Sequence, residues 1–106
     1  MEMLTDLNYK EVFASGKIVF VDFFANWCGP CKMLSPIVEE LAKERTDVEF
    51  YKVDVDECEQ LPAEFGIRSI PTIVIIKDNK LLKANVGFAP KEVLSKLIDE
   101  AVALAK

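Results

Sequence analysis

Apolar residues form two strand-like blocks in the first half of the chain. In residues 17–25 (KIVFVDFFA) both alternating sets of positions are apolar, apart from Lys17 and Asp22. A strand with this pattern is typically covered on both faces, so we expect it to be the central strand of a sheet. Residues 48–55 (VEFYKVDV) also have strand character and predict a second strand.

Two longer segments have the periodicity of helices. Between Pro30 and about Arg45, one apolar face consists of Leu34, Ile37, Val38 and Leu41. Pro36 lies inside this segment and predicts a kink. A last helix is expected from Pro90, a favourable first helical residue. Its apolar face consists of Val93, Leu94, Leu97, Ile98 and Ala101.

Two short helices are predicted from residues that cap helices. Asn8 with Glu11 has the pattern of a capping box, in which each side chain accepts a hydrogen bond from the other residue's backbone. Asp56 with Glu59 predicts the cap of another short helix, which Gly66 ends.

The remaining elements complete an α/β fold. Residues 72–77 and 81–87 predict an antiparallel hairpin, because Asn79 in the segment between them can adopt a left-handed turn conformation. A short first strand near residues 2–4 is compatible with the pattern. Alternating helices and strands predict a mixed, largely parallel sheet that is covered on both faces. Ligand chemistry in such sheets gathers beyond the carboxyl ends of strands, and the strand that ends at Phe24 leads there.

Composition and charge narrow the class of protein. The chain has 106 residues, 51% of them hydrophobic, which predicts a single domain over residues 1–106 with its own core. Thirteen basic and eighteen acidic residues give a net charge of -5, which argues against binding to nucleic acid. The longest apolar runs, IVFV and IVII, are far too short to cross a membrane.

The N-terminal residues MEMLTDLNYKEVF include acidic side chains and no continuous apolar segment, unlike a signal peptide. We therefore expect a cytoplasmic protein. Three cysteines, two of them close together, do not make a disulfide framework. In a reducing compartment, such a close pair indicates metal binding or redox chemistry.

The close pair, Cys28 and Cys31, lies where the buried strand becomes a helix. The Cys28 sulfur is then near the unpaired amides of a helix N-terminus, which favours its thiolate. Zinc would need further ligands, but the chain has no histidine and only Cys58 besides the pair. A purely structural disulfide would close a tiny loop and add little stability. A reversible dithiol switch is therefore favoured, with no metal and no bound cofactor, because the thiols themselves store the electrons.

Four segments carry a family resemblance: VDFFANWCGPCKMLSP, KVDVDE, GIRSIPT and VGF, in this order along nearly the whole chain. Together they resemble the thioredoxin family. The resemblance implies an α/β, thioredoxin-like three-layer sandwich, with a mixed four- or five-stranded sheet flanked by four helices. It also implies a protein disulfide reductase. Two residues depart from the family pattern: Phe24 stands where a second tryptophan is frequent, and Asn79 replaces a hairpin glycine.

The resemblance implies roles for the residues around the dithiol. Cys28 attacks a client disulfide, Cys31 resolves the mixed disulfide, and a thioredoxin reductase recharges the oxidised pair. Asp22 comes two residues after Phe20 and thus lies on the same face of the predicted strand, which predicts burial. The resemblance implies that Asp22 accepts the proton of Cys31 through water, with Lys52 nearby. The alternative for Asp22 is a solvated carboxylate at a strand edge, and the alternative for Lys52 is an ordinary surface lysine.

Pro71 stands at the start of a predicted strand. General frequencies favour a trans peptide bond there, whereas the resemblance implies a cis bond against the dithiol. It also implies that the backbone of Ile70 pairs with an extended client segment. Gly29 and Pro30 shape the turn between the cysteines. The implied landing surface consists of Trp27, Gly29, Pro30, Ile70, Pro71, Val86, Gly87 and Phe88. The alternative is that these are ordinary core and turn residues, above all Val86.

Two rival functions use the same residues differently. A disulfide oxidase or isomerase would favour histidine between the cysteines and an exported chain, whereas a binding module would use the apolar surface with incidental thiols. For Cys58 we favour a half-buried, inert thiol over a regulatory one. We expect a monomer whose partners are thioredoxin reductase and disulfide-containing client proteins, with no nucleic acid and no membrane.

Overall fold

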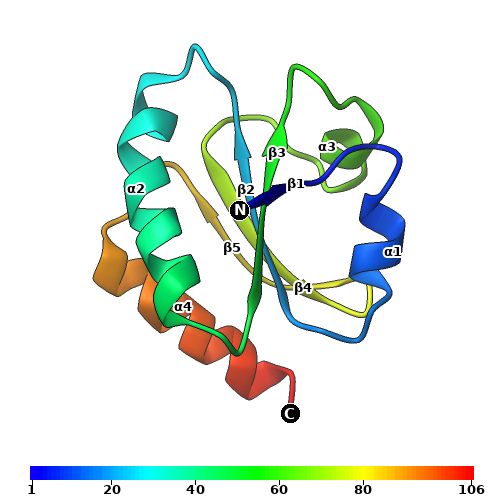
Figure 1. Cartoon of the computed structure of the whole chain (residues 1–106), viewed down its shortest axis with the longest axis vertical. Helices are drawn as coiled ribbons and strands as arrows, with labels where there is room; N and C mark the ends of the chain where they lie inside the picture. Colours follow the sequence, from blue (N-terminus) through cyan, green and yellow to red (C-terminus); the bar gives the residue numbers. More distant parts are fainter.

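The computed structural model describes residues 1–106 as a five-stranded mixed sheet with four helices (Figure 1). The strands are β1 (Glu2–Met3), β2 (Val19–Phe24), β3 (Glu49–Asp54), β4 (Thr72–Lys77) and β5 (Lys80–Val86). The helices are α1 (Tyr9–Phe13), α2 (Gly29–Glu44), α3 (Gln60–Glu64) and α4 (Lys91–Leu104). The strand order is β1-β3-β2-β4-β5, so β2 is central, as its sequence predicts.

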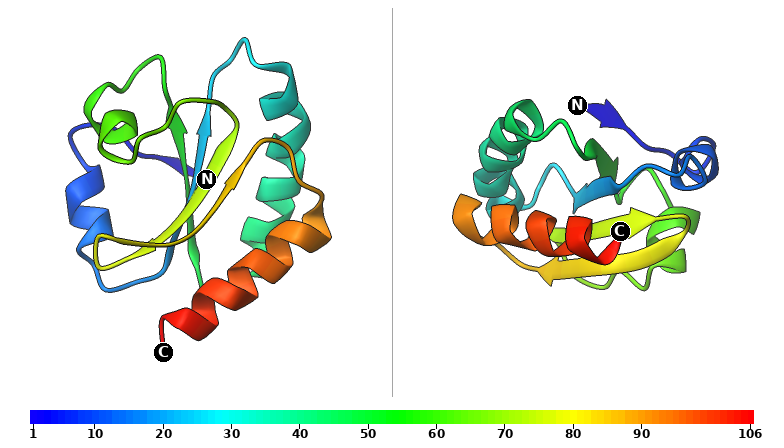
Figure 2. Two further views of the ribbon diagram at one scale, coloured as in Figure 1. Left: turned by 180° about the vertical axis from the view of Figure 1, so that it is seen from behind. Right: turned by 90° about the horizontal axis from the view of Figure 1, so that it is seen from below.

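The helices form two outer layers, with α2 and α4 on one face of the sheet and α1 and α3 on the other (Figures 1 and 2). Strand β2 runs parallel to β3 and antiparallel to β4, and all its residues except Phe24 are buried. Phe20 packs with α2 and α4, whereas Val19 and Val21 pack with α1 and α3. This alternation explains why both sets of positions in β2 are apolar.

The two predicted side-chain caps are wrong, although both short helices form. Asn8 precedes α1, but its side chain accepts a hydrogen bond from the backbone N–H of Thr5 at 2.8 Å instead of capping the helix. Glu59 precedes α3 and gives no side-chain cap either. The carboxylate of Asp6 replaces it and accepts hydrogen bonds, at 2.9 to 3.1 Å, from the backbone N–H groups of Glu59, Gln60 and Leu61.

The hairpin prediction is confirmed. Strands β4 and β5 are antiparallel, and Asp78 and Asn79 between them have φ angles of 51° and 64°. Two successive left-handed residues are what a tight two-residue hairpin requires. In α4, Leu94, Ile98 and Ala101 are buried as expected, but Val93 is 47% exposed, which corrects the predicted apolar face. Pro90 precedes α4 as its N-cap instead of being its first residue.

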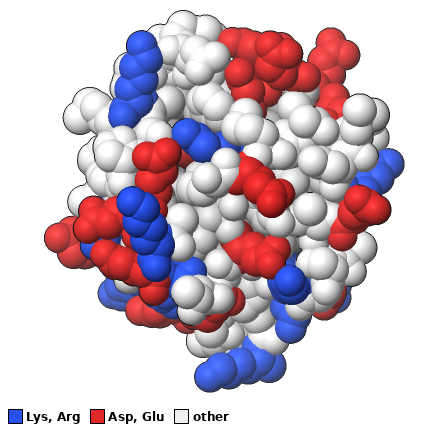
Figure 3. Space-filling model, in the orientation of Figure 1, with Lys and Arg blue, Asp and Glu red and all other residues white.

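Charges of both signs are mixed on the face shown in Figure 3, where lysine and arginine side chains lie among acidic and uncharged ones. This face therefore carries no continuous basic surface of the kind that binds phosphate backbones. No helix combines the length and the apolar composition needed to span a bilayer.

Candidate active site

The cysteine pair lies at the start of α2, immediately beyond the carboxyl end of β2. Cys28 is the N-cap residue, and its sulfur accepts a hydrogen bond from the backbone N–H of Cys31 at 3.2 Å. Pro30 occupies the first turn, where no intrahelical N–H bond is lost. The two cysteines are joined in a disulfide with Cα atoms 5.3 Å apart, and each is only 4% exposed. The positive end of α2 and the N–H bond both favour a thiolate on Cys28 when the pair is reduced.

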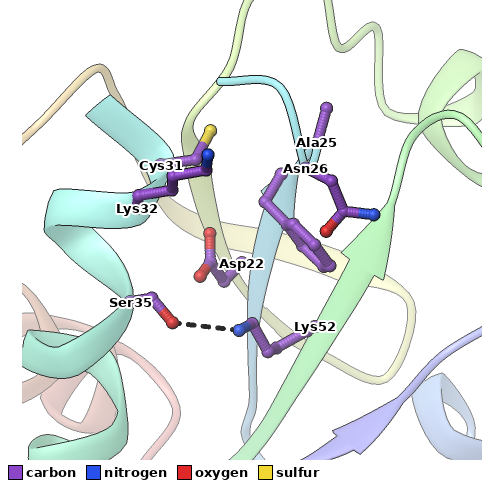
Figure 4. Close-up of a pocket in the computed structure, with 8 residues that line it drawn as sticks. Asp22, Ala25, Asn26, Cys31, Lys32, Ser35 and Lys52 are labelled. Carbon is purple, nitrogen blue, oxygen red and sulfur yellow. Dashed lines mark hydrogen bonds between the residues drawn. The ribbon is translucent and has the colours of Figure 1, made fainter. Parts of the chain in front are cut away.

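A cavity of about 120 Å³ lies behind Cys31, between α2 and strands β2 and β3 (Figure 4). It is lined by Asp22, Phe24, Ala25, Asn26, Cys31, Lys32, Ser35 and Lys52. A polar cavity of this volume has room for water. The second cysteine therefore has a polar space beside it, although its other neighbours, such as Ala25 and Ile70, are apolar.

Asp22 is buried in the middle of β2, as predicted, with only 1% of its surface exposed. Its Oδ1 atom is the only buried side-chain nitrogen or oxygen without a hydrogen-bond partner. Burial disfavours the charged carboxylate and raises its pKa from 3.8 to about 6, while the positive charge of Lys52 acts in the opposite direction. A carboxyl group with this pKa exchanges protons near neutral pH.

Lys52 lies directly beside Asp22 in the β2–β3 pairing. Its ammonium donates a hydrogen bond to the hydroxyl of Ser35 at 3.1 Å and lies 4.8 Å from the centre of the Phe24 ring. The half-buried side chain thus borders the cavity, so the ordinary surface lysine is the weaker interpretation. Ser35 is a further site residue that no sequence motif singled out, although its position four residues after Cys31 puts both on one face of α2.

The Ile70–Pro71 peptide bond is cis, as the resemblance implies. Ile70 packs against the cluster that contains both cysteines, and the carbonyl of Pro71 accepts a hydrogen bond from the N–H of Gly87 at 2.8 Å. This contact ties the start of β4 to the end of β5 beside the dithiol. Gly87 has a φ of 92°, a left-handed conformation that glycine adopts without strain.

Large apolar side chains are exposed near the dithiol. Trp27 is 71% exposed, Val86 68% and Phe88 45%, so the alternative assignment of Val86 to the core is wrong. The indole Nε1–H of Trp27 donates a hydrogen bond to Asp56 at 2.9 Å. Asp56 was predicted as a helix cap, and its contact with Trp27 was missed.

Cys58 lies apart from the dithiol, in the apolar cluster that packs α1 and α3 against the sheet. It is buried, not half-buried as expected, and its sulfur lies 3.8 Å from the carbonyl oxygen of Leu4. Burial raises the pKa of this thiol, which keeps it protonated and poorly reactive. No three His, Cys, Asp or Glu side chains are grouped so that they could hold a metal ion.

The comparisons with known proteins agree with this geometry. A thioredoxin family model matches residues 1–100. Thioredoxin of Mycoplasmoides gallisepticum is 47% identical over 88 residues, covering 83% of this chain and 88% of that protein. Thioredoxin of Bacillus subtilis is 41% identical over 97 residues, covering 91% of this chain and 92% of that protein. The chain belongs to the thioredoxin family.

Solved thioredoxin structures have the same fold. Thioredoxin of Plasmodium falciparum superposes with a TM-score of 0.87 at 35% identity, covering 94% of this chain and 98% of that one. A mutant thioredoxin from Halobacterium salinarum superposes with a TM-score of 0.85 at 37% identity, covering 95% of this chain and 88% of that one. The predicted three-layer fold and family are thus confirmed. As a family member with a CxxC pair at disulfide distance, the chain is a thiol–disulfide oxidoreductase of the dithiol reductase type.

Proposed function

We propose that this protein is a dithiol electron carrier that reduces disulfides of client proteins and is recharged by a thioredoxin reductase. The Cys28 thiolate attacks one client sulfur, forming a mixed disulfide and releasing the first client thiolate. The Cys31 thiolate then attacks Cys28, which releases the second client thiolate and forms the Cys28–Cys31 disulfide. Two electrons pass from the protein to the client. The observation that carries this order is the position of Cys28 as the N-cap of α2, with an N–H bond to its sulfur.

Cys31 must lose its proton before it can attack, and we assign the acceptor role to Asp22. Its carboxyl group borders the same cavity as Cys31, which has room for a water to relay the proton. Its pKa of about 6 suits a group that accepts a proton near neutral pH. Lys52 supports this role, because a nearby positive charge keeps part of the carboxyl ionised.

The client is assigned to the exposed apolar surface around the dithiol. In this assignment the backbone of Ile70 pairs with an extended client segment as a short added strand. Gly29, Pro30 and the cis-bonded Pro71 shape the approach to the cysteines. The contact residues are Trp27, Ile70, Val86, Gly87 and Phe88. We assign the protein to the cytoplasm as a monomer, and in this reducing compartment the dithiol is kept in the reduced form that attacks client disulfides.

Reduction of insulin tests the proposed function. With dithiothreitol as electron donor, catalytic amounts of the protein are expected to accelerate the turbidity caused by precipitating insulin chains. A double variant, Cys28→Ser with Cys31→Ser, keeps the apolar surface and is expected to lose the acceleration. If the wild-type protein gives no acceleration, the binding-module interpretation is correct instead.

Phe88→Asp is expected to weaken client binding without changing thiol chemistry. Phe88 is exposed two residues beyond β5, so the new carboxylate removes apolar contact with little effect on the core. The expected result is a rise of about tenfold in KM for a protein disulfide, with nearly unchanged reduction of oxidised glutathione.

Leu81→Asp is the matched control for this change. Leu81 is an exposed apolar residue near the start of β5, next to the hairpin and far along the strand from Val86. Its replacement is expected to leave both substrates unaffected. If Phe88→Asp reduces the rates with both substrates equally, the docking assignment fails, because the damage then lies in the fold or the thiols.

A further inference from the structure

Ser35 links the helix that carries the dithiol to the lysine beside the buried aspartate. It lies one turn after Cys31 on α2 and lines the same cavity. Its hydroxyl accepts the hydrogen bond from the Lys52 ammonium at 3.1 Å. In Figure 4, Asp22 lies between Cys31 and this Ser35–Lys52 pair. None of the roles assigned above involves the hydroxyl group.

The placement of the Lys52 ammonium is unexpected for a charged group in a small cavity. Asp22 lines the same cavity, and its Oδ1 atom has no hydrogen-bond partner. The lysine nevertheless bonds to the neutral hydroxyl of Ser35 and lies against the Phe24 ring. A direct ion pair would satisfy the unpartnered oxygen, but it would also lower the tendency of the carboxylate to take up a proton.

We propose that Ser35 is a positioning residue for the second step of the reaction, since its hydroxyl holds the Lys52 ammonium away from Asp22 and leaves the carboxylate free to accept the proton of Cys31. This inference rests on the proton transfer proposed above. In this role, Ser35 sets the distance between the Lys52 ammonium and the Asp22 carboxylate. The positive charge stays near enough to act on Asp22 through space, without bonding to it.

The groups around Asp22 determine where the Lys52 ammonium would bond if the Ser35 hydroxyl were removed. The charged or titratable neighbours that line the cavity are Lys52 from β3, and Cys31 and Lys32 from α2. On the other side, β4 offers only apolar Ile73 opposite Asp22. Without the Ser35 hydroxyl, the free acceptor for the Lys52 ammonium in this cavity is therefore the unpartnered oxygen of Asp22.

The test is a ¹³C NMR titration of the Asp22 carboxyl in the oxidised protein, where the paired cysteines do not titrate. Ser35→Ala is expected to lower the pKa of Asp22 by about 1, because an opposite charge moves into contact with it. Ser35→Thr keeps the hydroxyl and is expected to restore the wild-type value. In a Lys52→Met background, Ser35→Ala is expected to have no effect on this pKa.

A kinetic measurement connects the titration to the reaction. In a single-turnover experiment, release of the client from the mixed disulfide is followed against pH. Ser35→Ala is expected to move the acidic limb of the profile lower by about 1 pH unit and to slow release at the plateau roughly threefold, because Asp22 becomes a weaker base. Ser35→Thr is expected to follow the wild-type profile.

The outcomes separate the two proposals. An unchanged or raised pKa in Ser35→Ala, or the same fall in the Lys52→Met background, overturns the role of Ser35 alone. An unchanged release rate in Asp22→Asn overturns the proton transfer itself, and with it any kinetic role for Ser35. Coupled shifts in the titration, matched by the shifted pH profile, support the inference.

Discussion

Cys31→Ser is expected to accumulate stable mixed disulfides between Cys28 and client proteins. The remaining Cys28 can still attack a client disulfide, but the serine hydroxyl cannot resolve the product. Cys28→Ser is expected to trap almost nothing, because Cys31 lies within the first turn of α2, borders the cavity behind the helix and lacks the N-cap position. Turnover of a protein disulfide is expected to fall at least about 10³-fold in both variants.

Trapped complexes are measured on non-reducing gels, with the linked cysteine identified by mass spectrometry. Cys58→Ala serves as the matched control, since it removes a buried thiol that lies in a different cluster from the dithiol. This control is expected to release clients as the wild-type protein does. Equal trapping by Cys28→Ser and Cys31→Ser would show that the attacking and resolving roles are not divided between them.

The main elements of the fold were predictable because their sequence patterns are local. Strand β2 is apolar at every position but Asp22, which identifies a central strand before any neighbour is known. In α2, the buried residues recur every three or four positions. The hairpin turn at Asp78 and Asn79 also depends on the conformation of two adjacent residues.

The cap of α3 was not predictable because the side chain that supplies it is distant in the sequence. Asp6 lies 53 residues before Glu59, yet its carboxylate accepts the hydrogen bonds at the start of α3. Asp56 is of a residue type that favours helix caps, but its carboxylate accepts a hydrogen bond from Trp27 instead. A short polar side chain near a helix start favours a cap, but tertiary contacts decide which side chain supplies it.

In the site too, local features were predictable from the sequence and contacts between distant residues were not. The WCGPC segment predicts the dithiol and its place at the helix start, because five adjacent residues contain the whole arrangement. The bond between Ser35 and Lys52 joins α2 to β3 across 17 positions, and only the folded chain brings them together. The burial of Asp22 followed from strand alternation, whereas its lack of a hydrogen-bond partner depends on every group around it.

Asp22→Asn is expected to stabilise the protein at pH 8 while slowing its reaction. The folded pKa of about 6 lies above the ordinary 3.8, so ionisation of this carboxyl opposes folding. Below the unfolded pKa there is no penalty; above it the free energy of unfolding falls with rising pH, and the penalty is complete once the pH has passed the folded pKa. The full penalty at pH 8 is about 3 kcal/mol, and at pH 5 it is about 1.5 kcal/mol.

Urea melts of wild type and Asp22→Asn at both pH values measure this penalty, together with turnover of a protein disulfide. Glu39→Gln, which removes one exposed carboxylate, changes the net charge equally and is expected to leave stability nearly unchanged. Because Cys31 loses its proton acceptor, client release by Asp22→Asn is expected to slow about 10²-fold at pH 7. If Asp22→Asn destabilises the protein at pH 8 and turnover is intact, the carboxylate is a paired structural group, and its role in proton transfer is wrong.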